Sequence, residues 1–262
     1  LRSEGEREEG RTSHADVELL YGRPIARWWD LVAGVRHDFA PGADRSHAAI
    51  GVIGTGYVGL VTALALAELG YHVRCLDIDA AKVARLQHGT APFVEPGVPE
   101  LLRANLERLH FTVDPREVFG HCASAFVTVD TPPLASGDAD LSRVDAVLDS
   151  IPRDVDDLIL VMKSTVPVNT GRRVQMRLAQ QGRRGVRYVS NPEFLREGSA
   201  IADVFRPDRV VVGATSAEDF ALMDDLYKPF VRNGAPILRM DPLSAEMTKY
   251  AANSYLATRI SF

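Results

Sequence analysis

The chain has 262 residues, of which 46% are hydrophobic and 25% are charged, and these values are ordinary for a globular protein. The formal net charge of -5 gives no basis for a nucleic-acid or membrane-surface partner, and no apolar run is long enough to span a bilayer. Only two cysteines occur, Cys75 and Cys122, which excludes a disulfide framework and fits the reducing cytosol. We therefore expect a cytoplasmic protein without nucleic-acid or membrane partners.

Residues 1–47 differ from the rest of the chain. They open with "LRSEGEREEGRTSHAD", which is charged and lacks a core pattern, so we expect this N-terminal extension to be partly disordered. The stretch "YGRPIARWWDLVAGV" follows and holds both tryptophans. It suits a short amphipathic helix, an interaction segment or the tail of an upstream domain. A linker is predicted at "APGAD", Ala40 to Asp44.

From residue 48 onward, eight short apolar runs alternate with helix-like stretches. The runs are "AAIGVIG", "HVRCLDI", "HFTV", "SAFVTV", "LILVMKS", "VRYVS", "RVVVG" and "PILRM". Strands that alternate with helices indicate βαβ units and a mostly parallel sheet, and near-continuous apolar runs predict strands buried on both faces. We predict an α/β domain over residues 48–241 and one helix over residues 242–262, with no stop signal at its end.

The first apolar run leads into the glycine-rich stretch "GTGYVG", Gly54 to Gly59, and a helical pattern follows. In such a loop the first glycine permits the tight turn, Gly56 lets a pyrophosphate approach the backbone, and Gly59 allows helix and strand to pack closely. The helix N-terminus then offers free N–H groups to an anion. This context predicts a dinucleotide site that includes Tyr57 and Val58, in preference to a merely structural turn.

The second predicted strand ends at Asp77, about 20 residues beyond the first glycine. A carboxylate at this position accepts hydrogen bonds from the ribose hydroxyls of NAD and repels the 2′-phosphate of NADP, so NAD is the predicted cofactor. The alternative role for Asp77 is to cap the next helix. Lys82 suits either the adenosine phosphate region or a solvated helix face, and Cys75 on the same strand is interpreted as a buried core thiol.

Polar side chains follow two later strands. "VDTPP" places Thr131 just after one strand, and "KSTVP" places Ser164 and Thr165 just after the next. Ligands in open α/β sheets bind at the carboxyl ends of strands, so these hydroxyls suit a cofactor or a bound water. The alternatives are an ordinary turn closed by prolines at Thr131 and a helix cap at Ser164 or Thr165.

Two further polar pairs have a spacing of four residues. Glu193 and Glu197 lie in "SNPEFLREGSA" and share a face only if this segment is helical; in a loop, Glu193 points into the cleft and Glu197 points elsewhere. Lys249 and Asn253 lie on the predicted C-terminal helix. Together they would stabilise a developing oxyanion, and the alternative is a polar stripe on a surface helix.

Taken together, these stretches resemble the UDP-glucose/GDP-mannose dehydrogenase family. The resemblance rests on "GVIGTGYVGLVTALALAELG", "DIDAAKV", "EPGVPELL", "VDTPP", "KSTVPVNTG", "SNPEFLREGSAIADVFRPDRVVVG" and "AEMTKYAANSYLATRISF". These motifs occur in the family's order from about Ala48 to the last residue. The stretch "NPEFLREGSAIADVFRPDRVV" is most similar to the UDP-glucose 6-dehydrogenase branch. The resemblance implies a Rossmann-like, doubly wound fold that continues into a long central helix, through which the full-length parent forms a homodimer.

The family oxidises the primary alcohol of a sugar nucleotide to a carboxylate with two NAD. The resemblance therefore implies that NAD contacts the glycine-rich turn and Asp77, and that UDP-glucose or a similar sugar nucleotide is the substrate, which would feed polysaccharide synthesis. It further assigns NAD contacts to four side chains outside the turn: Lys82, Thr131, Thr165 and Glu197. No metal is implied.

The same resemblance assigns catalytic and substrate-binding roles. Thr165 would orient a catalytic water, Glu193 would serve as a base, and Lys249 and Asn253 would stabilise oxyanions and hold the sugar. The backbone around Phe194, Leu195 and Arg196 would line the substrate.

The family also uses a cysteine nucleophile beyond the central helix, and neither Cys75 nor Cys122 matches it. We therefore expect the chain to be a fragment that lacks the catalytic-cysteine domain. Three alternatives stay open: a dehydrogenase of another sugar nucleotide of the GDP-mannose or UDP-N-acetylmannosamine type, a β-hydroxyacid dehydrogenase, which needs no cysteine, and an inactive NAD-binding module.

Overall fold

The computed structural model describes residues 49–155, 157–232 and 234–262. The extension predicted for residues 1–47, with its tryptophan segment and linker, lies outside the described residues. Ala43–Phe262 forms one compact unit, and the fold described below belongs to it. The predicted boundary at residue 241 between a cofactor domain and a central helix stays a prediction.

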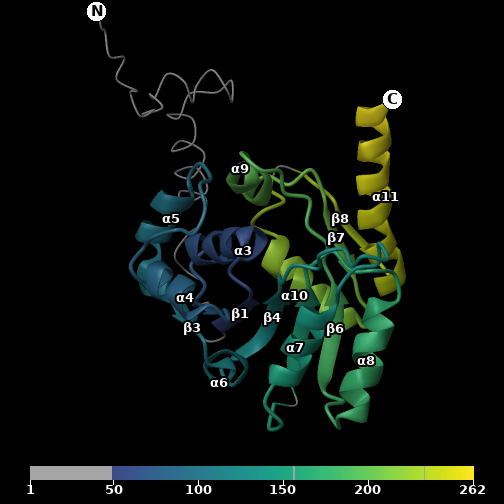
Figure 1. Ribbon diagram of the computed structural model, residues 1–262, viewed down its shortest axis with the longest axis horizontal. Coiled ribbons are helices and arrows are strands. Elements are labelled where there is room, and N and C mark those ends of the chain that lie inside the picture. The colour runs from purple at the N-terminus through teal and green to yellow at the C-terminus, as the bar shows by residue number, and fades with distance from the viewer. Residues whose placement is uncertain (1–48, 156, 233) are drawn as a thin grey trace, which may run out of the picture. The chain divides into compact units, whose positions relative to one another are not determined.

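Eight strands form a single sheet in the order β3-β2-β1-β4-β5-β6-β7-β8. All neighbouring strands run parallel except β6 and β7, which pair antiparallel through Ser190 and Gly213. The mostly parallel sheet predicted from the sequence is therefore confirmed (Figure 1). The strand bounds are β1 Ala49–Ile53, β2 Val73–Leu76, β3 Leu109–Thr112, β4 Cys122–Val127, β5 Leu158–Met162, β6 Val186–Ser190, β7 Val210–Gly213 and β8 Ile237–Met240.

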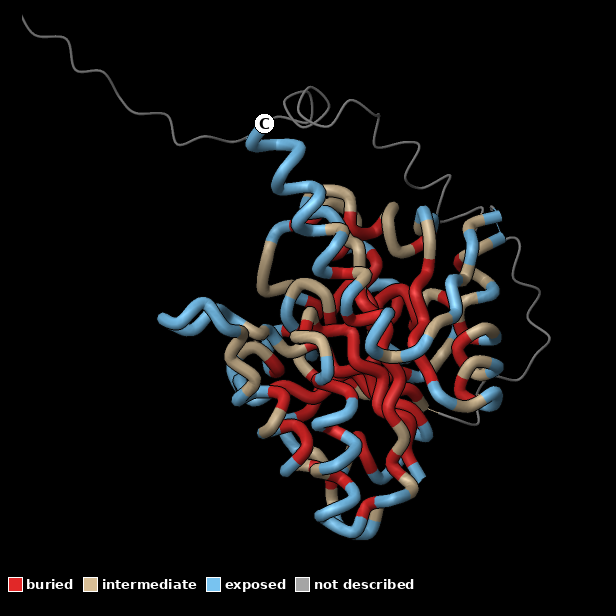
Figure 2. The backbone as a smooth tube through the Cα atoms, turned by 90° about the vertical axis from the view of Figure 1, so that its right-hand side faces the viewer, coloured by how far each residue is buried: buried red, intermediate tan, exposed pale blue. Residues whose placement is uncertain are grey.

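Each of the eight predicted apolar runs overlaps one of these strands, and β3 and β4 begin one and two residues before the predicted runs HFTV and SAFVTV. All five residues of β5, with the sequence LILVM, are buried, and four of the five in β1 are buried. Such strands cannot leave one face in water, so helices must cover both faces of the sheet. Figure 2 shows the buried residues gathered along the strands between outer helices that are largely exposed.

Helices cover the sheet on both sides. One face is covered by α6, α7 and α8, whose apolar residues join those of the central strands in one cluster around Phe119, Leu148 and Tyr188. On the other face lie α3, α9 and α10 (Figure 1). The helix bounds are α3 Tyr57–Glu68, α4 Ala80–Gln87, α5 Val98–Ala104, α6 Pro115–Phe119, α7 Ser142–Ser150, α8 Thr170–Gln180, α9 Ala200–Phe205, α10 Ala217–Tyr227 and α11 Pro242–Ser261, with a 3-10 turn at Leu106–Arg108.

Short polar side chains start four of these helices. Asp79, Asp114, Ser216 and Asp241 each accept a hydrogen bond from a backbone N–H in the first turn of the helix that follows. Such a cap satisfies an N–H that has no partner inside the helix. The caps fix where α4, α6, α10 and α11 leave the sheet.

The helix α11 changes character along its length. Its first turns are anchored: Ala245, Glu246 and Lys249 are buried, and a Cβ built on Gly213 would lie 2.5 Å from the Cβ of Ala245. Its last turns are exposed, as the pale end of the chain in Figure 2 shows. The single helix predicted over residues 242–262 is therefore confirmed to Ser261.

The strand order reverses at one point of this sheet, between β1 and β4. From β1 the chain proceeds outward to β2 and β3, and then returns to β4 on the other side of β1. In open α/β sheets, ligands bind beyond the carboxyl ends of the strands at such a reversal. The loops after β1, β4, β5 and β6 therefore form the candidate site.

Candidate functional site

The turn between β1 and α3 has the geometry that its glycines predict. Gly54 adopts a φ of +93°, which side-chain-bearing residues rarely adopt. A Cβ built on Gly59 would lie 1.8 Å from the Gly54 carbonyl oxygen, so helix and turn approach too closely for any side chain. A Cβ built on Gly56 would meet nothing within 4 Å. Space is therefore open above the turn, and Tyr57 and Val58, both half-buried, begin α3 beside it.

A buried carboxylate stands next to this turn at the end of β2. One oxygen of Asp77 accepts hydrogen bonds from the Thr55 amide at 2.8 Å, the Thr55 hydroxyl at 2.6 Å and Lys82 Nζ at 2.8 Å. The other oxygen accepts from the Asp79 amide at 3.0 Å. Burial acts to raise the pKa of Asp77, but the bonds from Lys82 and Thr55 outweigh it and hold the pKa below its ordinary value.

The structure bears on two alternatives from the sequence. Lys82 forms an ion pair with Asp77, and its contact with the adenosine phosphate region stays a prediction. Helix α4 is capped by Asp79, not by Asp77. The role of Thr55 was not predicted. Its place between two motif glycines gave no signal, because the contact depends on β2 lying beside β1.

The two threonines predicted at the ends of β4 and β5 lie together. Thr131 Oγ1 donates to the Thr165 carbonyl oxygen at 2.6 Å. Helix α8 begins after Asn169, so neither Ser164 nor Thr165 caps it. Ser164 instead donates to the Val129 carbonyl oxygen at 2.6 Å. In the described part of the chain the Thr165 hydroxyl has no hydrogen-bond partner, which leaves it available to a ligand or a water.

Glu193 and Lys249 form an ion pair just beyond the end of β6. Lys249 Nζ lies 2.9 Å from Glu193 Oε1 and 2.5 Å from the Glu193 carbonyl oxygen, and Glu193 Oε2 accepts from the Leu195 amide at 2.6 Å. The lysine side chain is 9% exposed and the glutamate 15%. Two residues that are 56 positions apart in sequence therefore present a cation and a carboxylate together.

Glu197 and Asn253, which the sequence pairs with Glu193 and Lys249 at a spacing of four residues, do not join this ion pair. Residues 191–196 are not helical, so Glu193 turns inward while Glu197 is exposed, as the loop alternative predicted. Asn253 is one turn beyond Lys249 on α11 and is exposed. In the described residues it has no hydrogen-bond partner, so its amide is available on the same helix face.

The loop between Glu193 and Glu197 is held from several sides. The guanidinium of Arg209 lies 4.1 Å from the centre of the Phe194 ring, and Lys249 Nζ lies 5.1 Å from it. Arg196 makes a two-point ion pair with Asp203 at 2.6 Å and 3.1 Å. These contacts fix the backbone of Phe194, Leu195 and Arg196 before any ligand arrives.

Glu95 is a second anchor of this loop that the sequence did not reveal. Its carboxylate is 3% exposed and accepts from the amides of Gly198 at 2.8 Å and Ala200 at 2.9 Å. Tyr57 donates from its hydroxyl to the Arg196 carbonyl oxygen at 3.2 Å. Burial, followed by the bond with Glu95, raises the pKa of Tyr57. The glycine-rich helix and the glutamate loop are thereby connected.

Glu246 is a third buried carboxylate and lies one turn before Lys249. It accepts from the amides of Asn169 at 2.8 Å and Gly171 at 2.7 Å and from the Tyr188 hydroxyl at 3.0 Å. A carboxylate is favoured at a helix N-terminus, where backbone N–H groups are free. Glu246 therefore ties α11 to the start of α8 and fixes Lys249 relative to the Thr165 loop.

The two cysteines do not join the site. Cys75 is buried within β2, and Cys122 is the first residue of β4, at the opposite end of the strand from Thr131. Burial raises the pKa of both thiols, that of Cys122 to about 12, so neither is a ready thiolate. Within the described residues, no group of three or more histidine, cysteine, aspartate or glutamate side chains is placed to hold a metal ion.

None of the helices in the described ranges combines the length and the apolar character that crossing a membrane requires.

Comparison with known families gives one match over most of the chain. The model described as the UDP-glucose/GDP-mannose dehydrogenase family, NAD binding domain, matches residues 48–231. A second model, copper resistance protein B precursor (CopB), matches residues 1–68. The second match covers far less than half of the chain and ends inside the first, so it shows no further family.

Two curated relatives are similar to about four fifths of the chain. The chain is 46% identical over 219 residues to UDP-glucose 6-dehydrogenase of Pseudomonas aeruginosa, covering 80% of this chain and 48% of that protein. It is 44% identical over 218 residues to UDP-glucose 6-dehydrogenase TuaD of Bacillus subtilis, covering 81% and 47%. The chain thus spans about half the length of the curated relatives it matches.

Solved structures agree with this placement. A UDP-glucose dehydrogenase from Pyrobaculum islandicum superposes with a TM-score of 0.78 at 38% identity, covering 86% of this chain and 53% of that one. GDP-mannose dehydrogenase from Pseudomonas aeruginosa, solved as a ternary complex, gives a TM-score of 0.77 at 31% identity, covering 81% and 51%. The chain therefore belongs to the UDP-glucose/GDP-mannose dehydrogenase family, and residues 48–231 are its NAD-binding domain.

Proposed function

We propose that the turn at Gly54–Gly59 and the N-terminus of α3 hold the pyrophosphate of NAD. The positive φ of Gly54 and the open space above Gly56 fit a dinucleotide that approaches the backbone closely. The first backbone N–H groups of α3, around Tyr57 and Val58, point to this space and favour an anion. Three groups support this proposal: the two glycines, the helix end and the carboxylate of Asp77.

Asp77 gives the site its preference for NAD. Among the residues that the structure describes, its second oxygen accepts one hydrogen bond, from the Asp79 amide, and has a lone pair left for a ribose hydroxyl. A 2′-phosphate at this place would meet the same negative charge. Lys82 remains at the rim, where it pairs with Asp77 and lies within reach of the adenosine half.

Thr131 and Thr165 line the nicotinamide end of the proposed cofactor site, and the family resemblance alone adds the exposed Glu197. The hydrogen bond between Thr131 and the Thr165 carbonyl oxygen joins the loops after β4 and β5, where a cofactor that starts at Gly54 would end. Bound NAD would supply a ring that accepts a hydride from the substrate.

The ion pair of Glu193 and Lys249 is the observation that carries the proposed reaction. We propose that the whole protein oxidises the primary alcohol of UDP-glucose to the carboxylate of UDP-glucuronate with two NAD. The alcohol releases its proton to a bound water before its carbon gives hydride to NAD, and the buried Lys249 ammonium and the Asn253 amide donate hydrogen bonds to the negative charge that this leaves on the oxygen. Glu193 holds Lys249 in place and accepts a proton from the water that completes the acid, while the free Thr165 hydroxyl orients that water.

The second oxidation needs a nucleophile to retain the aldehyde. Cys75 and Cys122 are buried away from Lys249 and cannot serve. The family resemblance implies a cysteine in the part of the relatives that this chain does not span. We propose that the 262-residue chain binds NAD but gives no steady turnover of UDP-glucose by itself.

The backbone around Phe194–Arg196 is the proposed support for the sugar nucleotide. Both curated relatives named above are UDP-glucose 6-dehydrogenases, which favours UDP-glucose. The similarity to a GDP-mannose dehydrogenase is lower, so a GDP-sugar is the second candidate.

Substrate oxidation in the full-length protein tests this function. With NAD in excess and UDP-glucose in limiting amount, we expect two NADH for each UDP-glucose. We expect no comparable rate with GDP-mannose or UDP-N-acetylmannosamine. Lys249→Ala should lower kcat about 100-fold. One NADH per sugar, or a preference for another sugar nucleotide, would contradict the proposal.

We also propose that the full-length protein forms a homodimer through α11 and acts in the cytosol. The last turns of α11 expose Tyr255, Leu256 and Ile260, which are 66%, 56% and 77% exposed. Apolar side chains in such a row favour a covering surface. Two buried thiols without a disulfide are compatible with a reducing compartment.

A further inference from the structure

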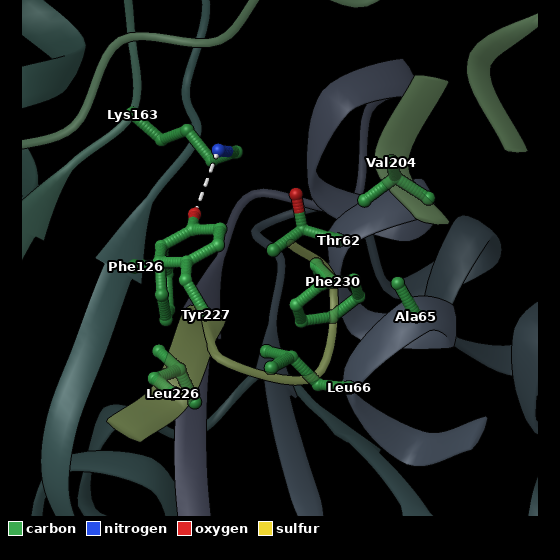
Figure 3. Close-up of a pocket in the computed structure, with 9 residues that line it drawn as sticks. All are labelled: Thr62, Ala65, Leu66, Phe126, Lys163, Val204, Leu226, Tyr227 and Phe230. Carbon is green, nitrogen blue, oxygen red and sulfur yellow. Dashed lines mark hydrogen bonds between the residues drawn. The ribbon is translucent and has the colours of Figure 1, made fainter. Parts of the chain in front are cut away.

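Lys163 is a buried lysine that the proposed chemistry does not use. It follows β5 directly, is 7% exposed and points to the side of the sheet that α3 and α10 cover. Its Nζ lies 3.2 Å from the Tyr227 hydroxyl and 3.3 Å from Asn191 Oδ1. Figure 3 shows Lys163 beyond the hydroxyl end of Tyr227, with the dashed line marking the bond to that hydroxyl. The Tyr227 hydroxyl in turn donates to Asn191 Oδ1 at 2.5 Å.

The ammonium of Lys163 has no carboxylate partner within the residues that the structure describes. Its two neutral acceptors, the Tyr227 hydroxyl and Asn191 Oδ1, are its compensation there. A buried charge held only by neutral groups costs stability. A lysine buried at such a cost has a role other than stability, and the geometry around Lys163 indicates which role.

Lys163 connects the starts of the two loops that form the nicotinamide end of the site. The amides of Lys163 and Ser164 both donate to the Val127 carbonyl oxygen, at 2.9 Å and 3.0 Å, and Thr165 follows at once. Asn191 is fixed by its amide to the Met162 carbonyl oxygen at 2.8 Å and by Nδ2 to the Val211 carbonyl oxygen at 2.8 Å.

Glu193 stands two residues beyond Asn191. The bond from Lys163 to Asn191 therefore joins the start of the loop that carries Thr165 to the start of the loop that carries Glu193 and Glu197. This tie lies beneath the loops and touches neither Gly54 nor Asp77.

We propose that Lys163 is a positioning residue for the nicotinamide half of NAD, and that it acts by holding the Thr165 and Glu193 loops at a fixed separation. The inference rests on the proposed NAD site. A cavity of about 20 Å³ adjoins the lysine and is lined by Thr62, Phe126 and Tyr227 among others. This is room for about one water, so the network has space to loosen when the ammonium is removed.

Titration calorimetry with NAD and with ADP-ribose separates this role from a general structural one. ADP-ribose retains every part of NAD except nicotinamide, so it reports the Gly54–Asp77 half alone. The variants are Lys163→Met, which keeps the apolar stem without donors, Lys163→Arg, which keeps a buried cationic donor, and Tyr227→Phe, which removes one acceptor. Lys228→Met, at the exposed residue directly after α10, is the matched control.

We expect Lys163→Met to bind NAD about tenfold more weakly, equivalent to about 1.4 kcal/mol, and to bind ADP-ribose within about twofold of the unchanged chain. Lys163→Arg should recover part of the loss, Tyr227→Phe should show a smaller loss confined to NAD, and Lys228→Met should match the unchanged chain. If Lys163→Met fails to fold, Tyr227→Phe decides.

An equal loss for NAD and ADP-ribose, or no loss for either in both variants, would overturn the inference while leaving the proposed cofactor site intact. Failure of the unchanged chain to bind NAD would instead refute the proposed function, and the inference with it.

Discussion

At the scale of single residues, Asp77 makes more contacts than the sequence motif predicts. It receives the Thr55 hydroxyl and the Lys82 ammonium on one oxygen and keeps lone pairs on the other. We predict that Asp77→Asn weakens NAD binding about tenfold and strengthens NADP binding, because the repelling charge is gone and Lys82 is released. Calorimetry of both cofactors checks this. Asp114→Asn, at the aspartate that caps α6, should change neither, and an unchanged NAD/NADP ratio in Asp77→Asn would contradict the role.

The pH dependence of stability gives a second prediction for Asp77. The pKa of its carboxyl in the folded chain lies below its ordinary value, which is about 3.9. The folded chain therefore binds fewer protons than the unfolded chain, so the contribution of Asp77 is complete above about pH 3.9 and is lost as pH falls through the folded-state pKa. The free energy of unfolding of Asp77→Asn should be about 2 kcal/mol lower than wild type near neutral pH.

Urea unfolding of the two proteins at several pH values measures this difference. It should shrink as the pH falls below about 3.9. A difference that stays constant or grows toward acid would show that Asp77 is not stabilised in its ionised form.

Two glycines of the same turn separate folding from binding. A Cβ on Gly59 would collide with the Gly54 backbone at 1.8 Å, whereas a Cβ on Gly56 would meet nothing within 4 Å. We predict that Gly59→Ala lowers the free energy of unfolding by about 3 kcal/mol, while Gly56→Ala leaves it within about 0.5 kcal/mol and weakens NAD binding at least about tenfold. Thermal unfolding and NAD titration measure the two effects. Normal NAD binding by Gly56→Ala would exclude a close approach of the pyrophosphate.

At the scale of elements, the sequence predicts all eight strands, because each is a short apolar run between turn residues. It does not predict that β6 and β7 pair antiparallel, since a local run carries no information on direction. The anchors Glu95, Glu246 and Lys163 also escape prediction. A lone glutamate or lysine is usually solvated, and the Ala200 amide that Glu95 binds is 105 positions away. By contrast, Gly54, Gly59 and Asp77 are predictable because their partners belong to one βαβ unit.

The tie between α11 and α8 yields a prediction at this scale. Glu246 accepts three hydrogen bonds, and a glutamine there would turn an NH₂ group toward one of the donors. We predict that Glu246→Gln lowers the free energy of unfolding by about 2 kcal/mol, while Glu218→Gln on the exposed first turn of α10 changes it by less than about 0.5 kcal/mol. Denaturant unfolding tests both, and equal stabilities for the two variants would show that Glu246 does not hold α11 in place.

At the scale of the whole molecule, the exposed turns of α11 predict association. Tyr255, Leu256 and Ile260 are more than half exposed, and such a row favours contact with a second apolar surface. We expect light scattering to give the 262-residue chain a mass above its 28.7 kDa, and Leu256→Lys with Ile260→Lys to bring the mass back to that of one chain. A single 28.7 kDa species before substitution would contradict an interface along α11.

We propose that this chain binds NAD without any further domain. Parallel titration of NAD and NADP into the 262-residue chain is the decisive measurement. We predict saturable binding of NAD and binding of NADP at least about tenfold weaker, because the glycine turn, the α3 N-terminus and Asp77 are all present. Equal binding of the two cofactors would contradict the role of Asp77, and binding of neither would contradict the site itself.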